Sequence, residues 1–119
     1  DEDVTVYGDS MKLARVFNNI LKNAIYYSYP DTTIKIWAES TDTDVWIYFC
    51  NKGKTIPAGK LNSIFEKFFR MDEARSTNTG GAGLGLAIAK EIITLHGGKI
   101  TAESENESTT FRISLPVTH

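Results

Sequence analysis

The sequence predicts an α+β fold, in which helices lie on one face of a mostly antiparallel sheet. Apolar residues recur at the helical period from 13 to 24 and again from 84 to 95, whereas residues 109–116 alternate between apolar and polar as a strand does. The expected order is helix, hairpin, loop, helix and hairpin, which places the helices against an antiparallel sheet. With 119 residues, 41% of them hydrophobic, we expect one domain over residues 1–119.

The first helix should begin at Asp9 or Ser10, because a short polar side chain can accept hydrogen bonds from the free N–H groups of the first turn. Its apolar stripe comprises Leu13, Val16, Phe17, Ile20, Leu21 and Ala24. Since successive helical residues turn by about 100°, Asn19 and Asn23 lie together on one flank of this stripe. The asparagine pair therefore borders the predicted core.

Four strands and a short helical segment account for most of the remaining chain. The strands are predicted at 33–39, 44–50, 99–104 and 109–116. Glycine and proline mark residues 51–59 as a loop, and a short helical segment is expected around residues 61–65. Apolar residues nearly vanish over 71–79, which should form a mobile lid unless a ligand orders it. Gly97 and Gly98 supply a left-handed stop for the second helix, which is expected to start at residue 84.

Glycines cluster at residues 79–86, directly before the second predicted helix. They let backbone N–H groups approach an anion closely at a helix N-terminus, an arrangement that suits a nucleotide phosphate. A flexible loop or a tight helix entry would use the same residues. The segment lacks the third glycine of the dinucleotide-binding fingerprint, where Leu86 stands, and the Gly-Lys-Ser/Thr triplet of the Walker loop. A phosphate site here must have another geometry.

The composition excludes several classes of partner. A formal net charge of -2, from 13 basic and 15 acidic residues, gives no overall field that would attract nucleic acid or an anionic membrane. Cys50 is the only cysteine, so no intrachain disulfide forms and a reducing cytoplasmic compartment fits. No apolar run approaches the roughly 20 residues that span a bilayer. We expect a soluble domain that contacts neither nucleic acid nor a membrane directly.

Four segments match, in order, the motifs of one protein family. The N box, a degenerate first glycine box, the F box and the second glycine box correspond to residues 19–24, 51–57, 64–70 and 80–86. The chain thereby resembles the ATP-binding catalytic domain of sensor histidine kinases (GHKL superfamily), and is most similar to the vancomycin-resistance sensor kinases. The resemblance implies a Bergerat-type two-layer α/β sandwich, with a mixed, mostly antiparallel sheet, about three helices and an ATP lid. Phe65 and Phe68 are expected to pack rather than to touch the ligand.

The resemblance implies catalytic and metal-binding roles for particular residues. Asn23 matches the asparagine whose side-chain oxygen ligates Mg²⁺, a cation that prefers oxygen ligands; taken alone, it would be a solvated surface residue. Asn19 stands where hydrolytic relatives carry a water-activating glutamate, and an amide lacks useful basicity, so the site should hold ATP without hydrolysing it efficiently. The alternative is that Asn19 packs or supports a neighbouring residue of the site. Arg70 and Arg75 match phosphate-contacting catalytic arginines, with solvated lid charge as the alternative.

The implied nucleotide-binding residues are Asn51, Gly53, Lys67, Gly81, Gly83, Leu84 and Gly85. Asn51 replaces the family's usual aspartate, so it would accept the adenine amino group more weakly, by about 1 kcal/mol or roughly fivefold in affinity. Thr55 replaces the second glycine of the first box and would place a Cβ where backbone usually approaches the nucleoside. Both departures predict weak ATP binding. Tyr26 stands where many relatives carry a phosphate-binding lysine, which leaves Lys22 or Lys67 for that contact.

The family's phosphoacceptor histidine is missing, since neither His96 nor His119 has its sequence context, and both are expected to be structural or incidental. The resemblance therefore implies the cytoplasmic, ATP-binding part of a membrane-anchored bacterial sensor kinase, which does not autophosphorylate alone. Its partners would be a phosphoacceptor helical domain of the same protein and a response regulator. The parent would be a homodimer and the isolated domain a monomer. Two alternatives remain open: a degenerate docking module without turnover, and a serine kinase of the same superfamily.

Overall fold

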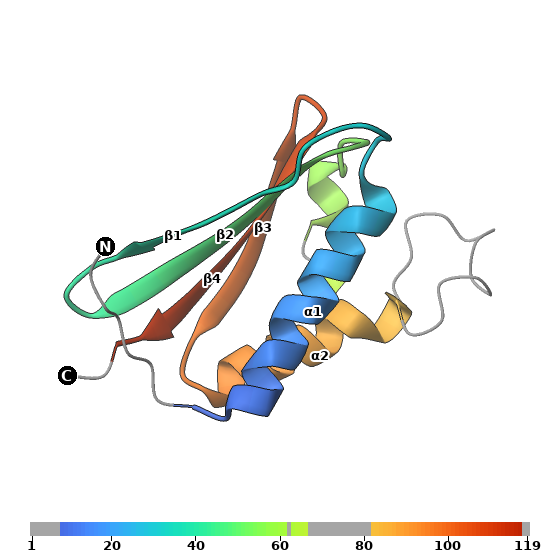
Figure 1. Cartoon of the computed structure of the whole chain (residues 1–119). Coiled ribbons are helices and arrows are strands. Elements are labelled where there is room, and N and C mark those ends of the chain that lie inside the picture. Colours follow the sequence, from blue (N-terminus) through green and yellow to red (C-terminus); the bar gives the residue numbers. More distant parts are fainter. Residues whose placement is uncertain (1–7, 62, 67–81, 118–119) are drawn as a thin grey trace.

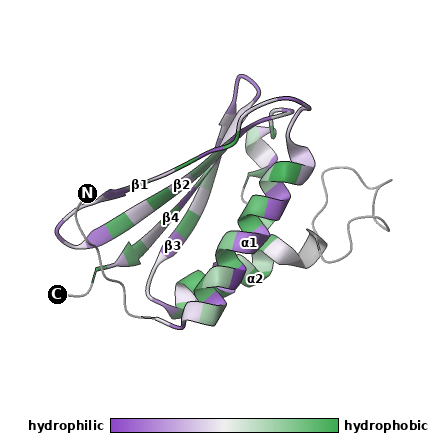
Figure 2. Ribbon diagram, viewed as in Figure 1, coloured by the Kyte–Doolittle hydropathy of each residue, from purple (hydrophilic) through white to green (hydrophobic). Residues whose placement is uncertain are grey.

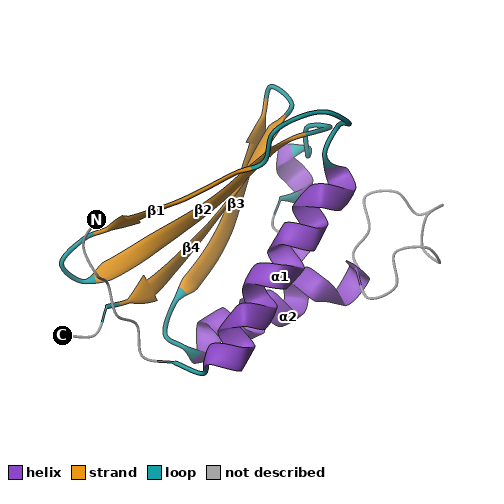
Figure 3. Cartoon of the chain, viewed as in Figure 1, coloured by secondary structure: helices purple, strands orange, loops and turns teal. Residues whose placement is uncertain are grey.

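A four-stranded sheet forms one layer of the molecule, and two α-helices pack across one of its faces (Figure 1). The computed structural model describes residues 8–61, 63–66 and 82–117, with the backbone alone for 82–84. Figure 3 shows both long helices on the same side of the sheet. The predicted two-layer α+β architecture is confirmed. None of the helices in the described ranges is long and apolar enough to cross a membrane.

Helix α1 spans Ser10–Tyr27 and begins where the sequence predicts. Asp9 is its N-cap, and the Asp9 carboxylate accepts hydrogen bonds from the N–H groups of Met11 and Lys12 at 3.0 and 3.1 Å. The buried members of the predicted stripe are Val16, Ile20 and Ala24. The helical period therefore identified the face that packs on the sheet.

The sheet has the strand order β1-β2-β4-β3, and every described pair is antiparallel. Its strands are β1 (Lys35–Ser40), β2 (Asp44–Lys52), β3 (Lys99–Glu105) and β4 (Ser108–Pro116). Both predicted hairpins form, and they join through β2 and β4 at the centre of the sheet. The parallel pair of the expected mixed sheet does not occur among the four described strands.

The region from the end of β2 to Phe65 differs from the prediction in two ways. β2 continues through Asn51 and Lys52, which the sequence assigns to a loop, because Thr109 and Ser108 of β4 pair with them. The single helical segment expected at 61–65 is replaced by two 3₁₀ turns, η1 (Ala58–Lys60) and η2 (Ser63–Phe65). Short turns of this kind need only one or two backbone hydrogen bonds each, so a continuous apolar stripe is not required.

Helix α2 spans Ala82–Leu95 and begins two residues before the predicted start. Its end is the predicted left-handed stop, with Gly97 at a φ of 79°. A Cβ on Gly98 would lie 2.1 Å from the carbonyl oxygen of Ser114. Glycine at residue 98 therefore lets the chain pass close to β4 as it turns into β3.

The core fills the space between the helices and the inner face of the sheet, and Figure 2 shows apolar residues in both layers. Its largest fully buried side chains are Val16, Ile20, Ile93, Phe111, Ile113 and Leu115. Phe65 packs edge-on against Phe111, with ring centroids 6.2 Å apart and an interplanar angle of 82°. The packing role expected for Phe65 is confirmed, while Phe68 lies outside the described residues.

The opposite face of the sheet carries an aromatic pair and an ion pair. Trp37 stacks on Tyr48 of the neighbouring strand, with ring centroids 4.9 Å apart and planes 8° apart. Arg112 and Glu103 form a salt bridge of 3.0 Å between β4 and β3. Cys50 lies on this face of β2 and is partly buried. Cross-strand pairs of this kind stabilise the sheet where no described helix covers it.

We expect Ile113→Ala to lower the free energy of unfolding by about 2–5 kcal/mol, because it leaves a cavity at a site with no exposed surface. Urea unfolding followed by circular dichroism measures the change. Ile36→Ala is the matched control, since Ile36 also lies on a strand but is 51% exposed, and it should cost less than about 1 kcal/mol. Equal losses in the two variants would contradict the central position of Ile113.

Candidate functional site

A hydrogen bond between Asn19 and Gly85 joins the two long helices. The Asn19 side-chain amide donates to the Gly85 carbonyl oxygen at 3.2 Å from a partly buried position. A Cβ on Gly85 would lie 3.9 Å from the Asn19 side chain, which is an ordinary contact. The bond connects the middle of α1 to the first turn of α2, so it brings two of the predicted motifs together.

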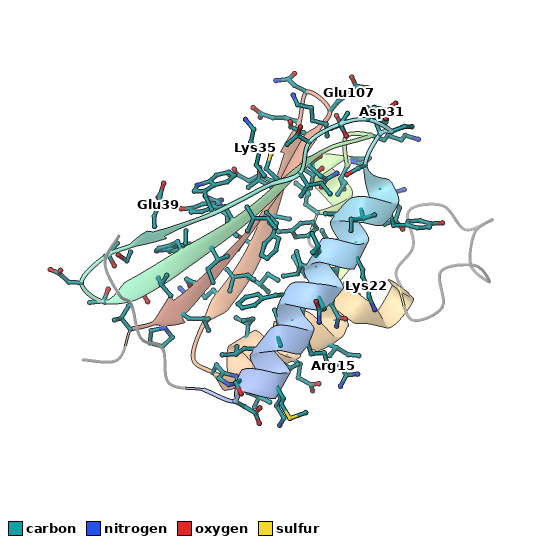
Figure 4. All side chains as sticks on the ribbon, viewed as in Figure 1. Arg15, Lys22, Asp31, Lys35, Glu39 and Glu107 are labelled. Carbon is teal, nitrogen blue, oxygen red and sulfur yellow. The ribbon has the colours of Figure 1, made fainter. Side chains whose placement is uncertain are left out.

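Asn23 lies one turn further along α1, on the same flank as Asn19, and both side chains are partly buried. Their neighbours Asn18 and Lys22 are exposed. Figure 4 shows Lys22 on the side of α1 away from the sheet. The predicted position of the asparagine pair at the border of the core is confirmed. Tyr26 follows on the next turn and is exposed.

Magnesium requires oxygen donors, and the described residues contain no preformed cage for it. In the described ranges no three His, Cys, Asp or Glu side chains lie close enough together to hold a metal ion. The amide oxygen of Asn23 fits a Mg²⁺ that takes its remaining ligands from water and phosphate oxygens.

Asn51 holds a buried position near the end of β2. The residue is 4% exposed, and the alternation along β2 places it on the same, inner face as Val45 and Phe49. An amide offers one acceptor oxygen and two N–H donors. A buried amide with both functions is suited to recognise the edge of a base.

Gly53 directly follows β2 and packs against the end of α1. A Cβ at residue 53 would lie 2.2 Å from the carbonyl oxygen of Tyr27. Gly53 also forms a bridge with Ser28, and the Tyr29 N–H donates to the Lys52 carbonyl at 2.8 Å. The structure therefore gives this glycine a packing reason, beside the nucleotide-binding role that the motif predicts.

The turn between β3 and β4 contacts the loop that follows β2. Asn106 and Glu107 form this turn with φ of 52° and 60°, values typical of a type I′ hairpin. The Glu107 carbonyl accepts from the Gly53 N–H at 3.0 Å, and the Glu107 N–H donates to the Thr55 hydroxyl at 2.8 Å. The Tyr29 hydroxyl donates to the Glu107 carboxylate at 2.8 Å.

Tyr29 and Glu107 are absent from the residues that the sequence singled out. The only signal was a tight turn between two alternating segments, and nothing in it indicates the distant partner. The hydrogen bond to the Glu107 carboxylate raises the pKa of Tyr29 above its ordinary value, because the bond needs the phenolic proton; slight burial and the Glu107 charge act in the same direction. Tyr29 is therefore held in its protonated form.

His96 links the far ends of the two helices. Its Nδ1 lies 2.8 Å from the Ile92 carbonyl oxygen, and its Nε2 accepts a hydrogen bond from the Asp9 N–H at 3.0 Å. The ring therefore donates from Nδ1 and accepts at Nε2. The structural role expected for His96 is confirmed, while His119 lies outside the described residues.

Several predicted site residues cannot be placed relative to these groups. Lys67, Arg70, Arg75 and Gly81 lie outside the described residues, as does the predicted lid at 71–79. Gly83 and Leu84 belong to the first turn of α2, beside Gly85. The structure thus assembles two parts of the predicted site: the α1–α2 contact at Asn19, and the end of β2 with its following loop.

Residues 8–119 match the family described as histidine kinase-, DNA gyrase B-, and HSP90-like ATPase. The chain is 62% identical over 115 residues to the sensor protein VanS of Enterococcus faecium, which covers 97% of this chain and 30% of that protein. It is 39% identical over 120 residues to the sensor histidine kinase WalK of Bacillus subtilis, covering 98% of this chain and 20% of that protein. The chain thus spans less than a third of these relatives.

Solved structures of histidine kinases share the fold. The catalytic domain of histidine kinase ThkA matches with a TM-score of 0.84 at 33% identity, covering 100% of this chain and 76% of that chain. The mycobacterial sensor histidine kinase MprB matches with a TM-score of 0.81 at 30% identity, covering 94% and 76%. ThkA in complex with the response regulator protein TrrA matches at 0.81 and 32%, covering 99% and 32%. The Bergerat-type fold expected from the sequence is confirmed.

We expect Gly53→Ala to lower the free energy of unfolding by about 1–3 kcal/mol, because the new methyl group would overlap the Tyr27 carbonyl. Gly59→Ala is the matched control, since no atom lies within 4 Å of a Cβ built there. It should leave stability unchanged or raise it by up to about 1 kcal/mol. Urea unfolding compares the two, and an unaffected Gly53→Ala would argue against the close approach of α1 and β2.

We expect Tyr29 to ionise at a higher pH than an ordinary tyrosine, whose pKa is about 10. Because the folded-state pKa is raised, the stability that this bond contributes is present below about pH 10 and is lost as pH rises through the raised value. Ultraviolet difference titration of the wild type against Tyr29→Phe isolates this phenol. Glu107→Ala should return its titration to the ordinary range; an unchanged titration would show that Glu107 is not the cause.

Proposed function

Because this chain belongs to the family of histidine kinase-, DNA gyrase B- and HSP90-like ATPases, we propose that it binds Mg-ATP and supplies the γ-phosphate to a histidine on a separate helical domain. The chain is the ATP-binding catalytic domain of a sensor histidine kinase, as its similarity to WalK and ThkA indicates. The observation that carries the proposal is the hydrogen bond from Asn19 to Gly85, which joins the N box to the second glycine box.

In this proposal the nucleotide binds where the N box meets the second glycine box. Asn51 accepts a hydrogen bond from the adenine amino group. Backbone N–H groups of Gly81, Gly83 and the residues up to Gly85 hold phosphate oxygens, aided by the positive end of the α2 dipole. Asn23 ligates Mg²⁺, which neutralises phosphate charge when it is bound.

The proposed chemistry is positioning and charge stabilisation rather than hydrolysis. Arg70, Arg75 and Lys67 supply positive charge to the transferred phosphoryl group. Asn19 has no useful basicity, so it does not activate water against the γ-phosphate. The phosphate therefore remains available to a histidine nitrogen that the phosphoacceptor domain presents in line. From that histidine it passes to an aspartate of a response regulator.

The parent protein is proposed to be longer than this chain. The chain spans 30% of VanS and 20% of WalK, which leaves room for a phosphoacceptor domain, a membrane anchor and a sensor part. We place this domain in the cytoplasm of a homodimeric parent. The solved complex of ThkA with TrrA supports a response regulator as the second partner. The identity to VanS supports a role in vancomycin-resistance signalling.

We expect Asn23→Ala to weaken Mg-ATP binding at least about tenfold, since a lost ligand to a charged group costs on the order of 1.5–3 kcal/mol. Asn18→Ala is the matched control, because Asn18 lies on the same helix but is exposed. Isothermal titration calorimetry of Mg-ATP measures both. Equal affinities in the two variants would remove Asn23 from the site, and no wild-type binding at millimolar nucleotide would favour the docking module.

We expect phosphotransfer when the domain is mixed with Mg-ATP and a helical phosphoacceptor domain bearing a histidine. Radiolabelled ATP followed by acid and alkaline treatment identifies the product, because phosphohistidine is acid-labile and stable in alkali. The domain alone should take up no label. Acid-stable phosphoserine on a partner protein would instead indicate the serine-kinase alternative.

A further inference from the structure

The loop after β2 is tied to the β3–β4 hairpin by three hydrogen bonds, two at its turn and one within β3. The Gly53 N–H donates to the Glu107 carbonyl at 3.0 Å, the Glu107 N–H donates to the Thr55 hydroxyl at 2.8 Å, and the Ile56 N–H donates to the Ser104 hydroxyl at 2.8 Å. We refer to Tyr29, Gly53, Thr55 and Glu107 together as the hairpin clamp. The clamp holds Gly53 and Thr55, and the separate bond from Ile56 to Ser104 holds the residue that follows.

The clamp has a second anchor on α1's side of the molecule. The Tyr29 hydroxyl donates to the Glu107 carboxylate at 2.8 Å, and the Tyr29 N–H donates to the Lys52 carbonyl at 2.8 Å. Figure 4 labels Glu107 at the tip of the β3–β4 hairpin, beside the segment that follows α1. Glu107 therefore contacts both segments that flank the end of β2.

Thr55 is the unusual member of the clamp. Its position in the motif is one where a glycine is expected, and a glycine has no hydroxyl to accept the Glu107 N–H. Without that acceptor, the Glu107 N–H would lose its partner in a turn whose φ of 60° already restricts the backbone. The Thr55 side chain thus supplies a bond that the usual residue cannot make.

We propose that Thr55 and Glu107 are positioning residues that hold residues 53–56, beside Asn51, in the conformation that receives the adenosine end of the nucleotide. This inference rests on the proposed function, because it concerns the same ATP site. A loop that is already ordered loses less conformational entropy when the nucleotide binds. The protein therefore binds ATP more tightly than it would with a mobile loop. In this inference the Thr55 hydroxyl supports ATP binding, while the crowding by its Cβ that the motif predicts stays a separate prediction.

The test compares Thr55→Val with Thr55→Ser, using Mg-ATP affinity by calorimetry and thermal unfolding of the same samples. Valine keeps the shape of threonine but removes the acceptor, so Thr55→Val should bind Mg-ATP about fivefold more weakly. Serine keeps the hydroxyl, so Thr55→Ser should restore affinity to within twofold of the wild type.

Thr41→Val is the matched control for a purely structural effect. The Thr41 hydroxyl accepts backbone N–H groups from Thr43 and Asp44 at 3.3 and 3.0 Å, in the turn at the other end of the sheet. This variant should lose thermal stability as Thr55→Val does, yet keep wild-type affinity. Equal affinity losses in both variants, or unchanged affinity in Thr55→Val, would overturn the inference.

Tyr29→Phe tests the clamp from its other side should Thr55→Val fail to fold. Tyr29 is 38% exposed, so loss of its hydroxyl leaves the core intact. Releasing the Glu107 carboxylate should weaken Mg-ATP binding about twofold, and wild-type affinity in this variant would count against the inference. Absence of ATP binding by the wild type would instead overturn the proposed function itself, which separates the two failures.

Discussion

The helical layer and the sheet are joined through backbone at the point where α1 and β2 end together. The Tyr29 N–H donates to the Lys52 carbonyl, and Gly53 lies so close to the Tyr27 carbonyl that no side chain fits between them. Asn23 lies on the last turns of α1, and Asn51 is the penultimate residue of β2. Because both elements end at this junction, the spacing of the two proposed ligand-binding amides depends on it.

Local patterns were sufficient to predict most of the elements. The cap at Asp9, the stripe of α1, the alternation of β4 and the left-handed Gly97 are each determined by nearby residues, so the sequence alone reveals them. The extension of β2 through Lys52 could not be predicted this way, because its cause is pairing with β4. The same holds for the 3₁₀ turns, whose few hydrogen bonds leave no periodic signal.

The same distinction, between features set by nearby residues and features set by distant contacts, applies to the candidate site. Motif order identified Asn19, Asn23 and Asn51, and the structure places the first two on one flank of α1 and the third in a buried position. A motif compares one position at a time, so it treats Thr55 only as a missing glycine. The partner of its hydroxyl stands 52 residues further along the chain, where only the folded structure brings it into reach.

The central pairing of β2 with β4 encloses everything between them in one long loop. Asp44 lies opposite Pro116, and Lys52 lies opposite Ser108. The pairing of these strands therefore fixes the two ends of the loop, at Lys52 and Ser108. The entropy of closing such a loop grows only with the logarithm of its length, by about 0.6 kcal/mol per doubling. The stability of the sheet therefore depends only weakly on how many residues this loop contains.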